Sequence, residues 1–281
     1  MADPNPLASV SLSLASALSW GGGDFSGGVA AKKINTFQVV AVAHGTGLVL
    51  VLALALLRGE VFPGQHAMLW GAYAGIAGSV GLASLYRGLA VGKMGIVGPV
   101  AAVVTAALPV VYGIHMQGAP KMLQLAGFAV AAVGIVLISK PERAAGVPKG
   151  LGLAVLAGLG FGGFLICINR AGNTGVYWPL VAARVVSVVF MVVLLAMNKR
   201  DKVGSAGMWG LMMLAGALDT AGNALFVMAT QVGRLDVAAV LSSLYPASTV
   251  LLARFILHEK LNALQTAGMV AALAAIPMIA G

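Results

Sequence analysis

The sequence has few charged residues and almost no cysteine. Charged side chains make up 9% of its 281 residues, whereas about a quarter is usual in a soluble domain. The single cysteine, Cys167, excludes a disulfide framework or a cysteine-based zinc site. Hydrophobic residues instead make up 60% of the chain, and the mean hydropathy is +0.98. This composition predicts a multi-pass protein embedded in a lipid bilayer.

The sequence also lacks the patterns of nucleic-acid, metal and dinucleotide sites. The net charge is +9, but the basic residues are spread over the ends of apolar segments, which is typical of membrane topology signals. The histidines have no partner at metal-ligand spacing except the adjacent His258 and Glu259. The G-x-G-x-x-G match at 158–163 lies inside a membrane-length apolar run. We therefore expect no nucleic acid, no metal and no cofactor.

Apolar runs long enough to cross a bilayer recur along the whole chain. About 20 helical residues span a hydrocarbon core. By that rule the sequence predicts ten transmembrane helices, over residues 7–30, 35–57, 67–90, 94–116, 121–139, 149–168, 176–197, 207–230, 235–257 and 262–280.

The two parts of the chain align without a gap at an offset of 141 residues. For example, "LQLAG" at 123–127 faces "LQTAG" at 264–268. We therefore predict one five-helix repeat over 1–140 and a second over 141–281. A half with an odd number of spans ends on the opposite side from its start, so its copy must enter inverted. The predicted fold is all-α, with ten transmembrane helices in two inverted five-helix repeats around a central cavity.

Two segments carry a resemblance to a known family. "SWGGGD" (19–24) and "LARFILHEKLNALQTAGMVAAL" (252–273) resemble the drug/metabolite transporter superfamily, in its EamA-like group. His258-Glu259 stands where that group often has Gly-Glu. Within the group the chain most resembles amino acid exporters of the YddG type. The resemblance implies a cavity lined by the first, third, fourth, sixth, eighth and ninth helices, and export of aromatic and other neutral amino acids across the bacterial inner membrane.

Several ionisable residues lie at membrane depth, where such residues are functional candidates. At ~1.5 Å rise per residue, Asp24 and Arg87 come to similar depths in helices that the resemblance makes neighbours, so we expect an ion pair. Arg184 and Asp219 form a second expected pair. Each pair either locks helix contacts or, for Asp24 and Arg87, forms a gate. For His44 we favour an interhelical hydrogen bond over proton coupling.

A cavity for small metabolites requires aromatic walls and a few oriented polar groups. Trp20 and Phe161 are equivalent in the two repeats and precede paired glycines. The substrate-cavity candidates are Trp20, Tyr86, Phe161, Asn223, Ser242, Ser243 and Tyr245. Glycines allow helices to approach or bend, and proline removes a backbone hydrogen bond. The helix-bending candidates are Gly21, Gly22, Gly162, Gly163, Pro99, Pro109 and Pro246.

The sequence therefore predicts a secondary transporter of small metabolites, which acts as a monomer by alternating access and is not an enzyme. Its partners are a small-molecule substrate and the lipid bilayer. A transporter of sugars or phosphorylated compounds, a membrane-embedded enzyme and a membrane scaffold remain as alternatives. The orientation in the membrane also stays open. Of the 17 basic residues, 12 lie in the loops after the first, third, fifth, seventh and ninth predicted helices, which would place those loops in the cytoplasm and both termini outside. The resemblance implies instead that both termini lie inside.

Overall fold

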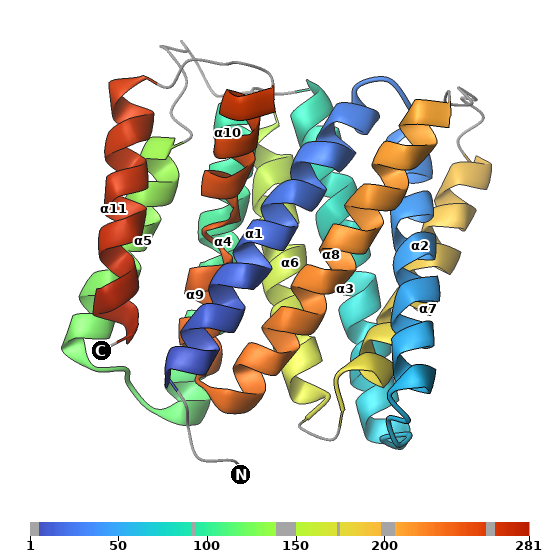
Figure 1. Ribbon diagram of the computed structural model, residues 1–281, viewed down its shortest axis with the longest axis horizontal. Coiled ribbons are helices and arrows are strands. Elements are labelled where there is room, and N and C mark those ends of the chain that lie inside the picture. The colour runs from blue at the N-terminus through green and yellow to red at the C-terminus, as the bar shows by residue number, and fades with distance from the viewer. Residues whose placement is uncertain are drawn as a thin grey trace.

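The structure of the protein is a computed structural model that describes residues 6–91, 94–138, 150–172, 175–197, 206–256 and 262–280. These residues form a bundle of helices and no strand (Figure 1). The helices are α1 (Pro6–Ala31), α2 (Thr36–Leu57), α3 (Gln65–Val91), α4 (Met94–Gln117), α5 (Met122–Ile138), α6 (Leu151–Arg170), α7 (Tyr177–Met197), α8 (Ala206–Val232), α9 (Leu235–Ser242), α10 (Tyr245–Ile256) and α11 (Ala263–Ala280). The all-α class predicted from the sequence is confirmed.

Seven of the described helices, α2, α3, α4, α6, α7, α8 and α11, are long and apolar enough to cross a membrane, and α5 is a shorter apolar helix. The outer faces of the bundle agree with that setting, because large apolar side chains such as Val189 and Val193 on α7 are exposed. Helix α1 has a lower hydropathy since it carries buried serines and Asp24. Ten crossings therefore stay a prediction, and the bundle itself has seven or eight strongly apolar helices.

The ninth predicted span, 235–257, is two helices in the structure and not one. Helix α9 ends at Ser242 and α10 begins at Tyr245. Pro246 has no amide hydrogen, so the carbonyl of Ser242 has no donor four residues later. The chain closes the turn with shorter bonds instead, from Leu244 N to Leu241 O (3.2 Å) and from Ala247 N to Leu244 O (2.9 Å). The proline thus interrupts the span, a stronger effect than the kink that the sequence suggested.

The two candidate prolines of the first half do not break their helix, and a bend there stays a prediction. Helix α4 runs without a break past Pro99 and Pro109. It packs along α6, where a methyl group on Gly158 would lie 2.7 Å from the carbonyl oxygen of Ala101. Close packing against a neighbouring backbone supports the continuous helix where proline removes a hydrogen bond. Among the described residues, the broken helix therefore belongs to the second half.

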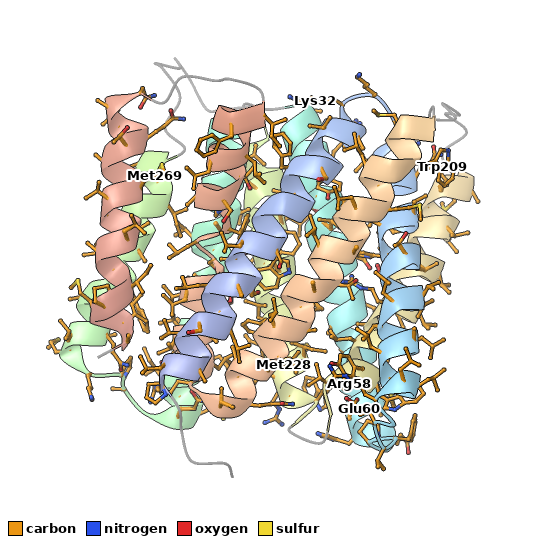
Figure 2. All side chains as sticks on the ribbon, viewed as in Figure 1. Lys32, Arg58, Glu60, Trp209, Met228 and Met269 are labelled. Atoms are coloured by element: carbon orange, nitrogen blue, oxygen red, sulfur yellow. The ribbon has the colours of Figure 1, made fainter. Side chains whose placement is uncertain are left out.

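The second half runs upside down relative to the first. Lys32 directly follows α1 and lies at one end of the bundle, whereas Arg58 and Glu60, which follow α2, lie at the other (Figure 2). The Glu60 carboxylate accepts hydrogen bonds from backbone amides at the start of α7, so α7 begins at the same end of the bundle as Glu60. Because α6 directly precedes α7, α6 ends there too, at the end of the bundle where α1 begins. Helices α1 and α6 are therefore antiparallel, as an inverted repeat requires.

Packing partners are also exchanged between the halves. Helix α1 packs mainly on α8 and on the α9–α10 pair, while α6 packs mainly on α3 and α4. Helix α2 packs on α7, and α5 packs on α11. The contacts are therefore reciprocal: α1 packs on α8 of the second half, and its repeat equivalent α6 packs on α3 of the first half. The space between the α1–α8 pair and the α3–α6 pair becomes the centre of the molecule (Figure 1).

Glu60 joins the halves at one end of the bundle. Its carboxylate oxygens accept hydrogen bonds from the amides of Val176 (3.0 Å), Tyr177 (2.9 Å) and Trp178 (3.0 Å). These amides are the unsatisfied donors at the start of α7, where the helix dipole also favours a negative charge.

Replacing Glu60 with alanine is expected to lower the free energy of unfolding by about 1–2 kcal/mol, because those amides lose their acceptor. Thermal unfolding in detergent, followed by circular dichroism, measures the effect. Arg58→Ala is the control, since Arg58 is an exposed neighbour. Equal melting temperatures for the two variants would contradict a capping role.

Candidate functional site

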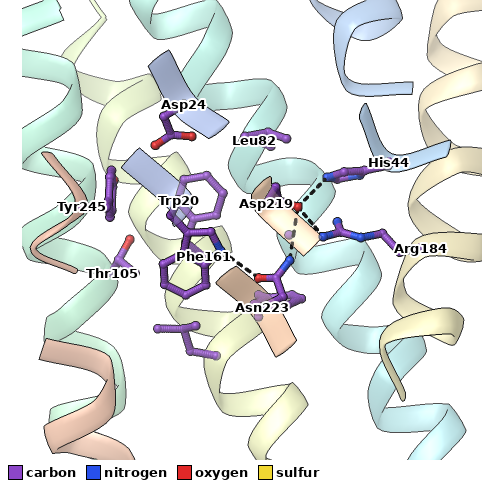
Figure 3. Close-up of a pocket in the computed structure, with 13 residues that line it drawn as sticks. Trp20, Asp24, His44, Leu82, Thr105, Phe161, Arg184, Asp219, Asn223 and Tyr245 are labelled. Atoms are coloured by element: carbon purple, nitrogen blue, oxygen red, sulfur yellow. Dashed lines mark hydrogen bonds and ion pairs between the residues drawn. The ribbon is translucent and has the colours of Figure 1, made fainter. Parts of the chain in front are cut away.

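A cavity of about 540 Å³, counted with its part open to solvent, lies between the two halves. Its lining residues come from eight helices of both halves. Figure 3 shows Asp24, Trp20, Phe161 and Asp219 around this space. The lining residues are Trp20, Asp24, His44, Gly78, Leu82, Thr105, Phe161, Phe164, Leu165, Arg184, Asp219, Asn223 and Tyr245.

Asp219 on α8 organises the polar side of the cavity. Its carboxylate forms an ion pair with Arg184 of α7 and accepts a hydrogen bond from Asn223 Nδ2 at 3.2 Å. His44 of α2 places its Nε2 3.9 Å from the same carboxylate. Asn223 follows Asp219 by one helical turn, so the two side chains share a face. The ion pair expected between Arg184 and Asp219 is present.

Hydrogen bonds extend this polar cluster to five helices. The Nδ1 atom of His44 contacts the hydroxyl of Ser187 on α7, and Ser79 Oγ on α3 lies 2.6 Å from Ser187 Oγ. At the other end, Trp20 Nε1 of α1 donates to Asn223 Oδ1 at 3.1 Å (Figure 3). The interhelical hydrogen bond favoured for His44 is thus found. A network of this kind fixes the relative positions of the helices that it joins.

The two sides of the cavity differ in polarity although they are repeat equivalents. At the offset of 141 residues, four positions on α1 and α8 have partners on α6 and α3 that line the same cavity. In each pair the member on α1 or α8 is polar or carries a polar atom, and its partner is apolar. The pairs are Trp20 with Phe161, Asp24 with Leu165, Asp219 with Gly78, and Asn223 with Leu82.

The aromatic members of these pairs are held in the same way on both sides. A methyl group on Gly222 would lie 2.5 Å from Trp20 Cδ1, and one on Gly81 would lie 2.7 Å from Phe161 Cδ1. Each ring therefore lies directly on a glycine of the facing helix, and any larger residue would push it away. The repeat conserves the placement of the two rings across the cavity.

Asp24 faces the cavity and is not paired with Arg87. Arg87 is exposed, although it directly follows Tyr86, which is buried. Consecutive helical residues point about 100° apart, so Arg87 turns to the outer side of α3 while Asp24 turns inward. Similar depth brought the two residues to the same level, but their directions keep them apart. The expected Asp24–Arg87 ion pair, and the gate built on it, are not found in this structure.

Three other cavity candidates are buried in helix contacts. Tyr86 belongs to an apolar core and packs with its hydroxyl against Gly27 of α1. The Ser242 hydroxyl donates to the carbonyl oxygen of Ser13 at 3.2 Å, which ties α9 to α1. Ser243 lies in the break between α9 and α10, and its buried hydroxyl has no hydrogen-bond partner within the described part of the chain. Tyr245, at the start of α10, is the remaining candidate near this break, and it does line the cavity.

The paired glycines allow close approach of neighbouring helices and do not interrupt their own. Helices α1 and α6 are continuous through them. A methyl group on Gly21 would lie 2.7 Å from the carbonyl oxygen of Tyr245, and one on Gly22 would lie 3.0 Å from Leu218 Cδ1. Gly162 meets Leu108 of α4 in the same way (2.9 Å to Cβ), whereas Gly163 has more room, with Ala77 Cβ at 3.5 Å.

Sequence reasoning missed several residues of the site. Thr105 and Phe164 line the cavity, and Ser79 and Ser187 complete the hydrogen-bond network. A signal was present for Ser187, which follows Arg184 by three residues and so shares its helix face. Applying the repeat offset to Asp219 and Asn223 would have found Gly78 and Leu82.

A further ion pair lies away from the cavity, at the start of α9. Arg234 Nη2 is 2.7 Å from Asp236 Oδ2 and also donates to the carbonyl oxygen of Gly118 at 2.8 Å. The hydrogen bond to Asp236 raises the pKa of Arg234 above its usual value. This contact ties α9 to the end of α4, so it is a structural link between the halves. Within the described ranges, no group of three His, Cys, Asp or Glu residues could hold a metal ion.

Comparison with known proteins gave a family and a fold. The family model of EamA-like transporters matches the chain twice, over residues 7–140 and 148–281. Among 28 solved chains that match, one crystal structure of a protein superposes with a TM-score of 0.78. The superposition covers 96% of this chain and 95% of that one, at 15% sequence identity, so the likeness concerns the fold alone. No curated protein matches the sequence.

Proposed function

Because the chain belongs to the EamA-like transporter family, we propose that it is a secondary transporter that exports aromatic and other neutral amino acids by alternating access. Membership of this family means that the protein is a multi-pass integral membrane protein built from two copies of one unit, and that it is a small-molecule transporter and not an enzyme. The amino acid substrate, the direction of transport, a monomeric state and a location in a bacterial inner membrane are parts of the proposal.

The main support for amino acids as substrates is that the cavity has one polar wall and one apolar wall. Asp24, Asp219 and Asn223 lie on one wall, and their repeat equivalents Leu165, Gly78 and Leu82 lie on the other. A solute with a charged end and an apolar end satisfies both walls, because a polar group that leaves water needs a polar partner and an apolar surface does not. Amino acids with apolar side chains have this form.

Alternating access is supported by the exchange of packing partners between the halves. Helices α1 and α6 occupy equivalent positions and run in opposite directions on the two sides of the cavity. In an inverted repeat, each half can adopt the packing of the other, which turns the same site from one face of the membrane to the other. The described residues show no nucleotide-binding loop, so we propose that a solute gradient drives transport.

Phosphorylated solutes fit this cavity less well. Arg184 is the one lysine or arginine among the described lining residues, and it is already bound to Asp219. A phosphate group requires several charge-assisted donors to replace its hydration. A sugar would leave the charged groups of the cavity without a function in recognition.

Counterflow in liposomes tests the proposal. Purified protein, reconstituted in vesicles loaded with unlabelled amino acid, is expected to accumulate labelled threonine, methionine or phenylalanine transiently. Trp20→Ala should reduce the rate about tenfold, because it removes a ring of the cavity wall and a hydrogen bond to Asn223. Trp209→Ala is the matched control, since that indole is 40% exposed on α8. The absence of flux for a broad panel of amino acids would refute the substrate class.

A further inference from the structure

One acidic side chain in the cavity has no ion-pair partner among the described residues. The lining residues include two carboxylates, Asp24 and Asp219, and one guanidinium, Arg184. Arg184 and Asp219 neutralise each other. In the part of the chain that the structure describes, no side chain forms an ion pair with Asp24. The cavity therefore has an unpaired acid in a setting where an isolated charge is costly.

We infer that Asp24 selects solutes by an ammonium group, and that the carboxylate of an amino acid is not required. The substrate class is then small primary amines with an apolar body, among which amino acids are the members that also carry an acid. This inference rests on the proposed transport through the cavity, but it concerns which part of the solute is recognised.

The surroundings of Asp24 suit an ammonium ion. Trp20 precedes it by one helical turn and so shares its face of α1, and Phe161 and Tyr245 line the same space (Figure 3). Aromatic faces attract cations, and a carboxylate forms strong charge-assisted hydrogen bonds with N–H groups. The buried Tyr245 hydroxyl has no hydrogen-bond partner among the described residues, so it can accept an N–H bond. Carboxylate, rings and hydroxyl together form a site for a primary amine.

The same cavity offers little to a carboxylate. Its guanidinium is bound to Asp219, and Asn223 Nδ2 donates to that same acid. A solute anion would meet the neutralised Arg184–Asp219 pair and, on the same wall, the carboxyl group of Asp24. The apolar body of the solute would lie against Phe161, Leu165 and Leu82 on the opposite wall, where burial of apolar surface is favourable.

Three solutes that share a phenyl body separate the two recognition schemes. Phenethylamine carries the ammonium alone, 3-phenylpropanoate the carboxylate alone, and phenylalanine both. Isothermal titration of the intact protein in detergent measures their affinities without any transport. We expect phenethylamine to bind at least about tenfold more tightly than 3-phenylpropanoate, the factor given by one hydrogen bond to a charged group.

Substitution of Asp24 completes the test. Asp24→Asn keeps the shape and is expected to weaken phenethylamine about tenfold while leaving 3-phenylpropanoate unchanged or slightly tighter. Asp24→Leu, which introduces the residue found at the equivalent position 165, should act in the same direction. Arg87→Gln is the control, because Arg87 is exposed outside the cavity.

Each outcome has one meaning. Equal affinities for the amine and the acid, or an amine affinity that survives both Asp24 substitutions, would overturn the inference. Counterflow of amino acids could persist in that case, and the proposed function would stand with a different recognition scheme. Selective amine binding without any amino acid flux would support the inference and refute amino acid export.

Discussion

Replacing Arg184 with methionine is expected to lower the free energy of unfolding by about 3 kcal/mol. Removal of one partner of a buried ion pair leaves the other charge uncompensated, which costs about 3–5 kcal/mol. The lower figure applies because the Asp219 side chain is 25% exposed to the cavity, whereas that of Arg184 is 5% exposed. Asn223 would remain as a hydrogen-bond donor to Asp219, which further limits the loss.

Denaturant unfolding in detergent, followed by the circular dichroism of the helices, measures this change. A second substitution separates the charge from the packing. Arg184→Met combined with Asp219→Leu should recover most of the lost stability, because it removes both charges and fills their space with apolar side chains of similar volume. Arg87→Met is the control at an exposed position of α3. If the single Arg184 variant unfolds like this control, the ion pair does not stabilise the fold.

Gly216→Ala is expected to produce the second large effect, a loss of about 1–3 kcal/mol from overpacking. The added methyl group would lie 2.6 Å from the carbonyl carbon and 2.8 Å from the Cα atom of Ala43 on α2. These are backbone atoms, so no side-chain rotation relieves the collision, and α2 and α8 must move apart. The His44–Asp219 contact lies between the same two helices and would lengthen.

A second glycine of α8 provides the matched control. Gly210 has no atom within 4 Å of the position of an added methyl group, so Gly210→Ala should be neutral or gain about 0.5–1 kcal/mol through helix propensity. The melting temperatures of the two variants in detergent give the comparison. If both substitutions shift the melting temperature upward, close packing at Gly216 is not a constraint on the fold.

The sequence predicted the architecture well because the relevant information is periodic along the chain. Hydropathy marks each helix, and the offset of 141 residues reveals the repeat without any knowledge of contacts. The prediction failed where local backbone chemistry and packing compete. Pro246 interrupts the span at 235–257, whereas Pro99 and Pro109 leave α4 continuous, although all three look alike in sequence.

The candidate site was predicted in part. The depth of each residue along its helix was enough to predict the ion pair between Arg184 and Asp219. The repeat was enough to predict that Trp20 and Phe161 line the same cavity. Depth failed for Asp24 and Arg87, since the ion pair also depends on the direction in which each side chain leaves its helix. The prediction for Tyr86 failed for a similar reason, because its side chain faces Gly27 and an apolar core instead of the cavity.

The sequence by itself determined that this protein is an all-helical membrane protein made of two related halves, and which ionisable residues lie at membrane depth. Those properties follow from composition, hydropathy and self-similarity, which are fixed along the chain. Only the tertiary structure decided that Arg184, Asp219, His44 and Asn223 form one cluster, while Asp24 forms no ion pair with any residue that the structure describes. Charge pairing depends on distance and direction between helices, and these are set by the packing of glycines and rings across the interface of the two halves.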